Sequence, residues 1–332
     1  MNTTKFYHYV LLLLVIFSSC HKDKNIDSPI LLPDEIIVND LGLYPEGIAY
    51  DEKEKVFYIS SVAKGRISKV KLDGSFETFV DAPNLVSTLG MKIDPINNRL
   101  IVCVSDPGFG ERSSSNTMAQ LAAIAIYDIS TANLLHFIPL SSGAPHLAND
   151  LVLDNVGNIY ISDSFSPTIY KIDKNGLVSK LIEDPKFLPQ PMNFGLNGLA
   201  FHPDGFLIVA KYDEGKLFKI PLSTPANFSE IHFTTDSIPA IDGILLTDNN
   251  TLVVASNNLG AGSHENAVYR LTSADNWNSM SIVNKTTTGS NSFPTTFTLA
   301  EGDLFVQYAR LQVLVGGNTP PADNFPIVKV TF

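Results

Sequence analysis

The main pattern in this chain is a series of short apolar stretches separated by turn residues, repeated about every 45 to 60 residues. The clearest unit has four apolar stretches at residues 47–50, 56–60, 66–72 and 76–80. They are rich in β-branched and aromatic residues, and turns such as Asp73-Gly74 separate them, which is typical of strands joined by tight hairpins. No segment shows a long 3.6-residue period, so we expect almost no helix.

The same order of strands recurs five more times, with first strands that begin near residues 89, 149, 198, 243 and 295. Six repeats of this kind predict an all-β fold, a six-bladed β-propeller with four antiparallel strands per blade. The sixth repeat lacks a fourth strand of its own. Residues 35–38 have strand character, so we expect this N-terminal strand to close the ring and remove the open sheet edges.

An oxygen-bearing side chain opens four of the first strands. The motifs are Pro45-Glu46-Gly47, Ala148-Asn149-Asp150, Leu196-Asn197-Gly198 and Ile241-Asp242-Gly243. Equivalent positions of a propeller converge on its axis, so Glu46, Asn149, Asn197 and Asp242 are predicted to meet there. The long loops 105–120 and 256–266 are predicted on the same face, an arrangement common at binding and catalytic sites.

Two carboxylates and two amides at one point predict a metal site made of hard oxygen ligands. Ca²⁺ is the preferred ion because all the ligands are oxygens. Mg²⁺ and Mn²⁺ are alternatives, and Zn²⁺ is a further one although it usually brings His or Cys. Taken singly, each of these residues has a structural alternative as a turn residue.

Other polar residues recur without forming such a set. Asp163, at the end of a second strand, is a candidate for the face that carries the site, and His146 is interpreted as a surface residue. No nucleophile-elbow motif is present, so covalent catalysis has no support. Five aspartates that follow first strands are interpreted as turn-capping residues: Asp51, Asp94, Asp154, Asp204 and Asp248.

The N-terminus has the features of an exported lipoprotein. Val10 to Phe17 is apolar but too short to span a membrane, and Phe17-Ser18-Ser19-Cys20 is similar to a lipobox. We therefore expect residues 1–19 to be a signal peptide, Cys20 to carry lipid, residues 20–36 to include a tether, and residues 37–332 to form the propeller. The alternative is an ordinary secretory signal, and both place the protein outside the cytoplasm.

The net charge argues against nucleic acid as a partner, and the cysteine content leaves one cysteine for the folded domain. With 34 acidic and 23 basic side chains the formal net charge is −11, and no basic stripe suits nucleic acid. If Cys20 is lipidated, Cys103 is the remaining cysteine and lies in an apolar run, where packing is its expected role. We expect a monomer that contacts the membrane through its lipid alone.

At the four motifs the chain resembles the gluconolactonase/regucalcin family, also called the senescence marker protein family, of calcium-dependent lactonase-like propellers. The resemblance implies that Glu46, Asn197 and Asp242 hold the metal, and that Asn149 and Asp150 supply a substrate or metal contact and a general base. It implies hydrolysis of a lactone, with the metal polarising the carbonyl oxygen and Asp150 or a metal-held water delivering hydroxide.

Two blades depart from the family pattern. Ser87-Thr88-Leu89-Gly90 lacks the Arg or other polar side chain that sugar lactonases bring from the second blade, and Phe293-Pro294-Thr295-Thr296 stands in the sixth. This favours a hydrophobic lactone, an aryl ester or an organophosphate-like compound. The alternative function is a non-catalytic propeller that binds a ligand or protein around a structural metal, and a metal-free condensing enzyme is a third.

Overall fold

Three antiparallel meanders of four strands account for the first half of the described chain. Each is built from consecutive strands, as the sequence pattern predicts. The first contains β2 (Ile48–Asp51), β3 (Val56–Ile59), β4 (Arg66–Val70) and β5 (Phe76–Asp81); the second β6 (Ser87–Asp94), β7 (Arg99–Ser105), β8 (Ala122–Asp128) and β9 (Leu134–Pro139); the third β10 (Ala148–Leu153), β11 (Ile159–Asp163), β12 (Thr168–Ile172) and β13 (Val178–Glu183).

The next eight strands form one sheet, in the order β14-β15-β16-β17-β21-β20-β19-β18. The strands are β14 (Leu196–His202), β15 (Phe206–Lys211), β16 (Lys216–Pro221), β17 (Ser229–Phe233), β18 (Ile241–Asp248), β19 (Thr251–Ser256), β20 (Ala267–Thr272) and β21 (Ser279–Thr287). A parallel pairing of β17 with β21, at His232 opposite Ser279 and Phe233 opposite Met280, joins the two halves. The described chain therefore has five sheets, where the sequence analysis expected six separate ones.

The last sheet joins the two ends of the domain. It contains β22 (Pro294–Ala300), β23 (Asp303–Tyr308), β24 (Asn324–Lys329) and β1 (Glu35–Asn39). β1 runs antiparallel to β24, with Glu35 opposite Val328 and Asn39 opposite Asn324. The N-terminal strand thus occupies the place that the sequence analysis assigned to it.

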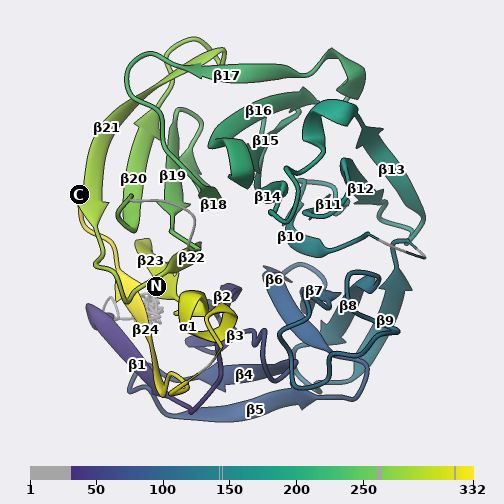
Figure 1. The fold of residues 1–332 in the computed structure, drawn as a ribbon, viewed down its shortest axis with the longest axis vertical. Coiled ribbons are helices and arrows are strands. Elements are labelled where there is room, and N and C mark those ends of the chain that lie inside the picture. The colour runs from purple at the N-terminus through teal and green to yellow at the C-terminus, as the bar shows by residue number, and fades with distance from the viewer. Residues whose placement is uncertain (1–30, 142, 144, 260–263, 318) are drawn as a thin grey trace, which may run out of the picture. The chain divides into compact units, whose positions relative to one another are not determined.

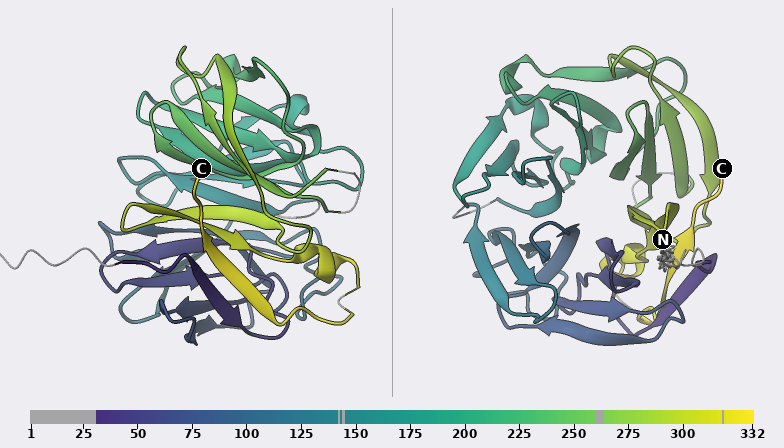
Figure 2. Two further views of the ribbon diagram at one scale, coloured as in Figure 1. Left: turned by 90° about the vertical axis from the view of Figure 1, so that its left-hand side faces the viewer. Right: turned by 180° about the vertical axis from the view of Figure 1, so that it is seen from behind.

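The sheets are arranged around a central axis (Figure 1). The first strands β2, β6, β10, β14, β18 and β22 each contact the next, and β22 contacts β2, so they form a closed ring. Figure 2 shows the same arrangement from the side and from behind. The result is an all-β, propeller-like fold.

Helical structure is nearly absent from the described residues, as expected. It consists of one short α-helix and three 3₁₀ turns: α1 (Leu311–Val315), η1 (Pro185–Phe187), η2 (Tyr212–Glu214) and η3 (Pro225–Asn227). α1 lies in the connection between β23 and β24, on the side of the ring that faces the viewer in Figure 1.

Burial falls from the axis to the rim. All residues of β2 and β3 are buried, whereas β5 and β9 have no buried residue. Apolar side chains therefore fill the space between neighbouring sheets, where each aliphatic or aromatic side chain contributes about 1.5–3 kcal/mol. Cys103 is fully buried in one such cluster, in agreement with its expected packing role.

Four of the five recurring aspartates, Asp51, Asp94, Asp154 and Asp248, cap turns as expected, whereas the Asp204 carboxylate accepts no backbone N–H among the described residues and lies 3.8 Å from His202 Nδ1. Asp51 Oδ1 accepts the backbone N–H of Lys53 at 2.8 Å, and Asp154 Oδ1 accepts that of Asn158 at 2.9 Å. Asp248 does the same for Asn250 at 2.8 Å. These carboxylates satisfy backbone donors that the hairpins leave unpaired.

The computed structural model describes residues 31–332, apart from 142, 144, 260–263 and 318. The predicted signal peptide and Cys20 lie outside the described residues. The chain divides into Met1–Leu31 and Leu32–Phe332. Leu32 and Ile36 are both 2 % exposed, so the second unit includes residues that the sequence analysis placed in the tether. Within the described part of the chain, no helix has the length and apolar character needed to cross a membrane.

Candidate functional site

Three of the four candidate ligands lie in β-bulges at the start of first strands. In β10 the register passes from Ala148–Asp163 to Leu151–Ile161, so β10 has one residue more than β11 over this stretch. The same shift occurs between Leu196 and Leu199 in β14, and between Ile241 and Ile244 in β18. A bulge re-aims the side chain that it contains, and here the bulges contain Asn149, Asn197 and Asp242.

Glu46 reaches the axis by a different local device. It directly precedes β2, and the hydroxyl of Ser60 accepts the backbone N–H groups of Glu46 at 3.1 Å and Gly47 at 2.6 Å. A side chain on Gly47 would overlap the carbonyl oxygen of Leu89 on the neighbouring first strand. The Glu-Gly motif therefore couples the position of the carboxylate to the close approach of two strands.

All four predicted ligands line one cavity at the centre of the ring. Its lining is Glu46, Val62, Leu89, Pro107, Phe109, Asn149, Phe194, Asn197, Tyr212, Asp242, Asn257, Leu259, Phe293, Leu311, Leu314 and Val315. The exposed fractions of Glu46, Asn149, Asn197 and Asp242 are 6, 5, 4 and 6 %. The structure thus brings together residues that lie about 200 positions apart in sequence.

Several buried oxygens of this set have no hydrogen-bond partner among the described residues. They are Glu46 Oε2, Asn149 Oδ1 and Asn197 Oδ1. The two amides use their nitrogens on the protein: Asn149 Nδ2 donates to Ser164 Oγ at 2.7 Å, and Asn197 hydrogen-bonds Asp242. Buried polar atoms are normally paired, so these oxygens fit a cation. The described residues contain no group of three or more His, Cys, Asp or Glu with metal-ligand spacing, and the donor set is half amide.

The surroundings of the cavity raise the pKa of both of its carboxyl groups, so the charged forms are disfavoured. Burial, followed by the charges of Asp242 and Asp150, raises the pKa of Glu46 well above its usual value. Burial also raises the pKa of Asp242 to about 7, although hydrogen bonds from Asn257 and Asn197 oppose the shift. Two buried acids that repel each other form a site that a divalent cation would relieve.

Asn257 is a residue of this site that the sequence analysis missed. It follows β19 and donates from Nδ2 to Asp242 Oδ2 and, at 2.8 Å, to the carbonyl oxygen of Pro294. Its own Oδ1 accepts the hydroxyl of Tyr212 at 2.9 Å. The available signal was an amide directly after the apolar run of a second strand.

Asp150 is close to this set but does not line the cavity. Its Oδ1 accepts the backbone N–H of Leu151 at 2.8 Å, and its Oδ2 is buried without a partner among the described residues. Burial raises the pKa of its carboxyl, and the charge of Lys92 opposes this shift. Its charge in turn raises the pKa of Glu46 and Asp242.

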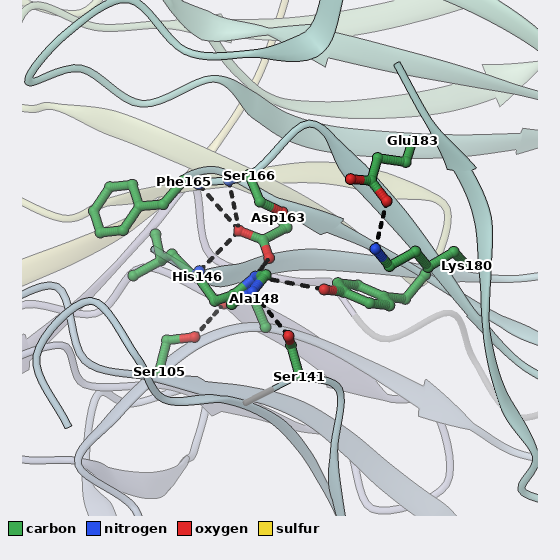
Figure 3. Close-up of polar contacts among 11 residues, drawn as sticks. Ser105, Ser141, His146, Ala148, Asp163, Phe165, Ser166, Lys180 and Glu183 are labelled. Carbon is green, nitrogen blue, oxygen red and sulfur yellow. Dashed lines mark hydrogen bonds and ion pairs between the residues drawn. The ribbon is translucent and has the colours of Figure 1, made fainter. Parts of the chain in front are cut away.

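His146 belongs to a separate polar cluster next to β10. Figure 3 shows it between Asp163 and Ser141: Nδ1 lies 2.7 Å from Asp163 Oδ2, and Nε2 lies 2.8 Å from Ser141 Oγ. A carboxylate, an imidazole and a hydroxyl in this order also make up the triad of acyl-transfer enzymes. None of the three lines the axial cavity, and we assign them to the support of the adjoining strand.

The backbone contacts of Asp163 explain that support. Its Oδ1 accepts the N–H groups of Leu147 at 2.8 Å and of Phe165 and Ser166 at 3.1 Å. Asp163 is fully buried, so these bonds fix the start of β10 against the end of β11. Ser164 lies within this segment, and its hydroxyl donates to the carbonyl oxygen of Leu196 at 2.6 Å while accepting from Asn149. The cluster thereby orients the Asn149 amide.

Comparison with known proteins places the chain in a family. Residues 44–280 match the model described as the SMP-30/gluconolactonase/LRE-like region. The chain belongs to the SMP-30/gluconolactonase/LRE-like family. A search of the curated proteins found no match.

Solved structures share the fold of this SMP-30/gluconolactonase/LRE-like protein at low identity. A gluconolactonase from Xanthomonas campestris is 16 % identical, with a TM-score of 0.59 and 89 % of each chain covered. Regucalcin from Agrobacterium tumefaciens, described as a calcium-binding protein, is 15 % identical, with a TM-score of 0.60 and 90 % of this chain and 95 % of that one covered. A chain of the nidogen/laminin complex is 15 % identical, with a TM-score of 0.55 and coverages of 77 and 85 %.

Proposed function

We propose that the axial cavity binds a divalent cation through Glu46, Asn149, Asn197 and Asp242. The observation that carries this proposal is the set of unpartnered oxygens on Glu46, Asn149 and Asn197 around one cavity, beside the Asp242 carboxylate. The two carboxylates balance a divalent charge. Ca²⁺ suits the all-oxygen set best, with Mg²⁺, Mn²⁺ and Zn²⁺ as alternatives.

On this site we propose hydrolysis of a lactone or related ester, in keeping with the lactonase-like family. A bound cation would supply polarisation of the substrate's carbonyl oxygen. Asn149 would orient the substrate as well as contribute to the cation site, and Asn257 would hold Asp242 in place. Burial raises the pKa of the Asp150 carboxyl. This carboxylate would act as the general base and accept a proton by way of a water molecule, since it lies outside the lining.

A second candidate function is ligand or protein binding without catalysis. The likeness to a chain of the nidogen/laminin complex supports it, because that chain was solved in a complex of two proteins. In this alternative the cation is structural, and the cavity captures a ligand without turnover.

We further propose that the ring has six blades. The eight-stranded sheet consists of two four-stranded meanders whose outermost strands pair over two residue pairs. Each meander has a first strand in the inner ring, as the other four sheets do. Counting each meander as one blade gives six.

The cellular setting of the chain remains a proposal from its sequence. We propose an exported lipoprotein, anchored through Cys20 after removal of residues 1–19, and monomeric. Mass spectrometry of the N-terminal peptide after expression in a bacterium tests the lipid on Cys20.

The proposed activity predicts turnover that depends on a divalent cation. With Ca²⁺ present, the purified chain is expected to hydrolyse members of a panel of lactones, aryl esters and phosphotriesters. The release of protons measures the rate. Removing the cation with a chelator is expected to lower the rate by about 10³-fold or more, and adding Ca²⁺, Mg²⁺, Mn²⁺ or Zn²⁺ singly identifies the ion. Cation binding without turnover of any panel member would support the second function instead.

The support of Asn149 by Ser164 predicts a weaker cation site in Ser164→Ala. Loss of the hydroxyl frees the Asn149 amide to rotate, so the Kd for the cation is expected to rise about 10-fold, as for other groups that orient metal ligands. Titration calorimetry measures this. The matched control is Ser68→Ala, because Ser68 is fully buried and its hydroxyl has no partner among the described residues. An equal effect in both variants would contradict the orienting role.

A further inference from the structure

The polar groups of the axial cavity are confined to one part of its lining. Five carboxylate and amide residues, including Asn257, surround the candidate cation site, and Tyr212 directs its hydroxyl to Asn257. The ten other described residues of the lining are apolar: Val62, Leu89, Pro107, Phe109, Phe194, Leu259, Phe293, Leu311, Leu314 and Val315. Among the residues that the structure describes, the lining contains no Lys, Arg, His, Ser or Thr.

The helix α1 supplies a continuous piece of this apolar wall. Leu311, Leu314 and Val315 all line the cavity, and their spacing of three and four residues places them on one face of the helix. Leu314 is 7 % exposed and packs in the core cluster that also contains Tyr44 and Phe325. The wall is therefore part of the folded domain.

Aromatic side chains from two other connections complete the wall. Phe109 follows Asp106, which holds its loop by accepting the N–H of Gly108 at 2.8 Å and the hydroxyl of Thr117 at 2.7 Å. Phe194 stacks on Phe165, with ring centroids 5.4 Å apart. These rings present carbon atoms toward the space that a substrate would occupy next to the cation.

A hydroxyl-rich sugar lactone does not suit such a wall. Each of its hydroxyl groups would leave water without a protein partner, which is costly for a buried polar group. A methylene group in the same place gains about 4-fold in affinity, from the free energy of transfer per methylene. The apolar wall is therefore expected to lower the affinity for sugar lactones and to raise the affinity for alkyl-substituted lactones.

We propose that the site takes lactones or esters that carry an apolar alkyl or aryl substituent, with the reacting carbonyl at the cation and the substituent against α1, Phe109 and Phe293. Sugar lactones are poor substrates. This inference rests on the proposed hydrolytic function and specifies its substrate class.

The test compares lactones that share one ring. The value of kcat/KM for the full-length chain with Ca²⁺ is measured for δ-valerolactone, δ-hexalactone, δ-octalactone and δ-decalactone, and for glucono-δ-lactone. We expect kcat/KM to rise at least 10-fold from δ-valerolactone to δ-decalactone, and that of glucono-δ-lactone to lie at least 100-fold below the longest member. Turnover that favours glucono-δ-lactone would overturn the inference and leave the proposed hydrolysis intact.

A pair of variants locates the preference on α1. Val315→Thr keeps the shape of a side chain that is 36 % exposed, so it is expected to fold, and it places a hydroxyl in the wall. It should lower kcat/KM for δ-decalactone about 4-fold more than it lowers kcat/KM for δ-valerolactone, which has no alkyl substituent to contact α1. The control is Val156→Thr at a valine that is 67 % exposed and does not line the cavity. Equal behaviour of Val315→Thr and Val156→Thr would contradict the role of α1.

A binding arm separates failure of the inference from failure of the proposed hydrolysis. The lactam analogues of δ-decalactone and glucono-δ-lactone resist hydrolysis, and calorimetry measures their binding in the presence of Ca²⁺. If no lactone is turned over, tighter binding of the alkyl lactam still supports the apolar ligand class and refutes only the hydrolysis. Absence of alkyl lactam binding, or preference for the sugar lactam, would overturn the inference.

Discussion

Replacing Glu46 by Gln is expected to lower kcat/KM for any substrate of the axial site by about 10³-fold, equivalent to about 4 kcal/mol of transition-state stabilisation. Gln keeps the size of the side chain but removes one of the two negative charges that face each other across the cavity. The remaining charge of Asp242 is insufficient to hold a divalent cation among neutral amides. Activity should therefore fall to the level of chelated wild type.

The matched control for this variant is Glu54→Gln. Glu54 lies in the turn between β2 and β3, where its carboxylate pairs with Lys69 at 3.0 Å and is 44 % exposed. The same substitution there should change kcat/KM by less than about 2-fold, because an exposed ion pair contributes little. Retention of full, chelator-sensitive activity in Glu46→Gln would show that the cation binds elsewhere.

Replacing Asp242 by Asn is expected to stabilise the metal-free protein while abolishing its response to Ca²⁺. Burial raises the pKa of Asp242 from 3.8 to about 7, so the folded chain carries an unfavourable buried charge at pH 8 that the unfolded chain does not. The full shift corresponds to about 4 kcal/mol. One hydrogen bond from Asn257 or Asn197 is lost in the variant, so the expected gain is about 1–3 kcal/mol.

The raised pKa of Asp242 determines how the stability of the metal-free protein depends on pH. A raised carboxyl pKa means that the folded state retains its proton longer, so its contribution favours folding below pH 4 and is lost as the pH rises through about 7. In the presence of chelator, the midpoint of thermal unfolding of the wild type should therefore fall between pH 5 and pH 8 relative to that of Asp242→Asn. Saturating Ca²⁺ should raise the wild-type midpoint at pH 8 and leave that of the variant unchanged.

An exposed aspartate provides the comparison for this experiment. Asp323→Asn, at a side chain that is 73 % exposed, should leave both the midpoint and its Ca²⁺ response as in the wild type. If Asp242→Asn is less stable than the wild type in chelator, the result would contradict the view that the buried charge of Asp242 destabilises the metal-free protein.

The repeated motifs were sufficient to predict that these polar residues meet at one cavity, because the spacing of the motifs reflects the ring. Asn149, Asn197 and Asp242 occupy the same bulge in three first strands, so an apolar run preceded by one oxygen-bearing residue identifies all of them. Their convergence follows from topology and needs no knowledge of individual contacts. The pattern does not define sheet boundaries, because the pairing of β17 with β21 joins strands that are distant in sequence.

There are physical reasons why the roles of residues outside the repeat could not be predicted from the sequence. Asn257 is a lone amide after β19, and its role depends on its contact with Asp242, which local patterning does not encode. The run Leu311–Val315 is as apolar as a strand, and it folds as the short helix α1 between β23 and β24. His146 was interpreted as a surface residue, whereas the contact with Asp163 holds it in a partly buried cluster.

The pairing of β1 with β24 has a consequence for how the molecule is made. The strand that completes the last sheet comes from the beginning of the domain, and its partner β24 is the last strand of the described residues. A ribosome therefore releases the first segment long before its partner exists, and the ring stays open until synthesis has passed residue 329. Contacts between such remote segments form slowly. A chain cut short before β24 would keep β1 as an unpaired strand, open to pairing with another copy.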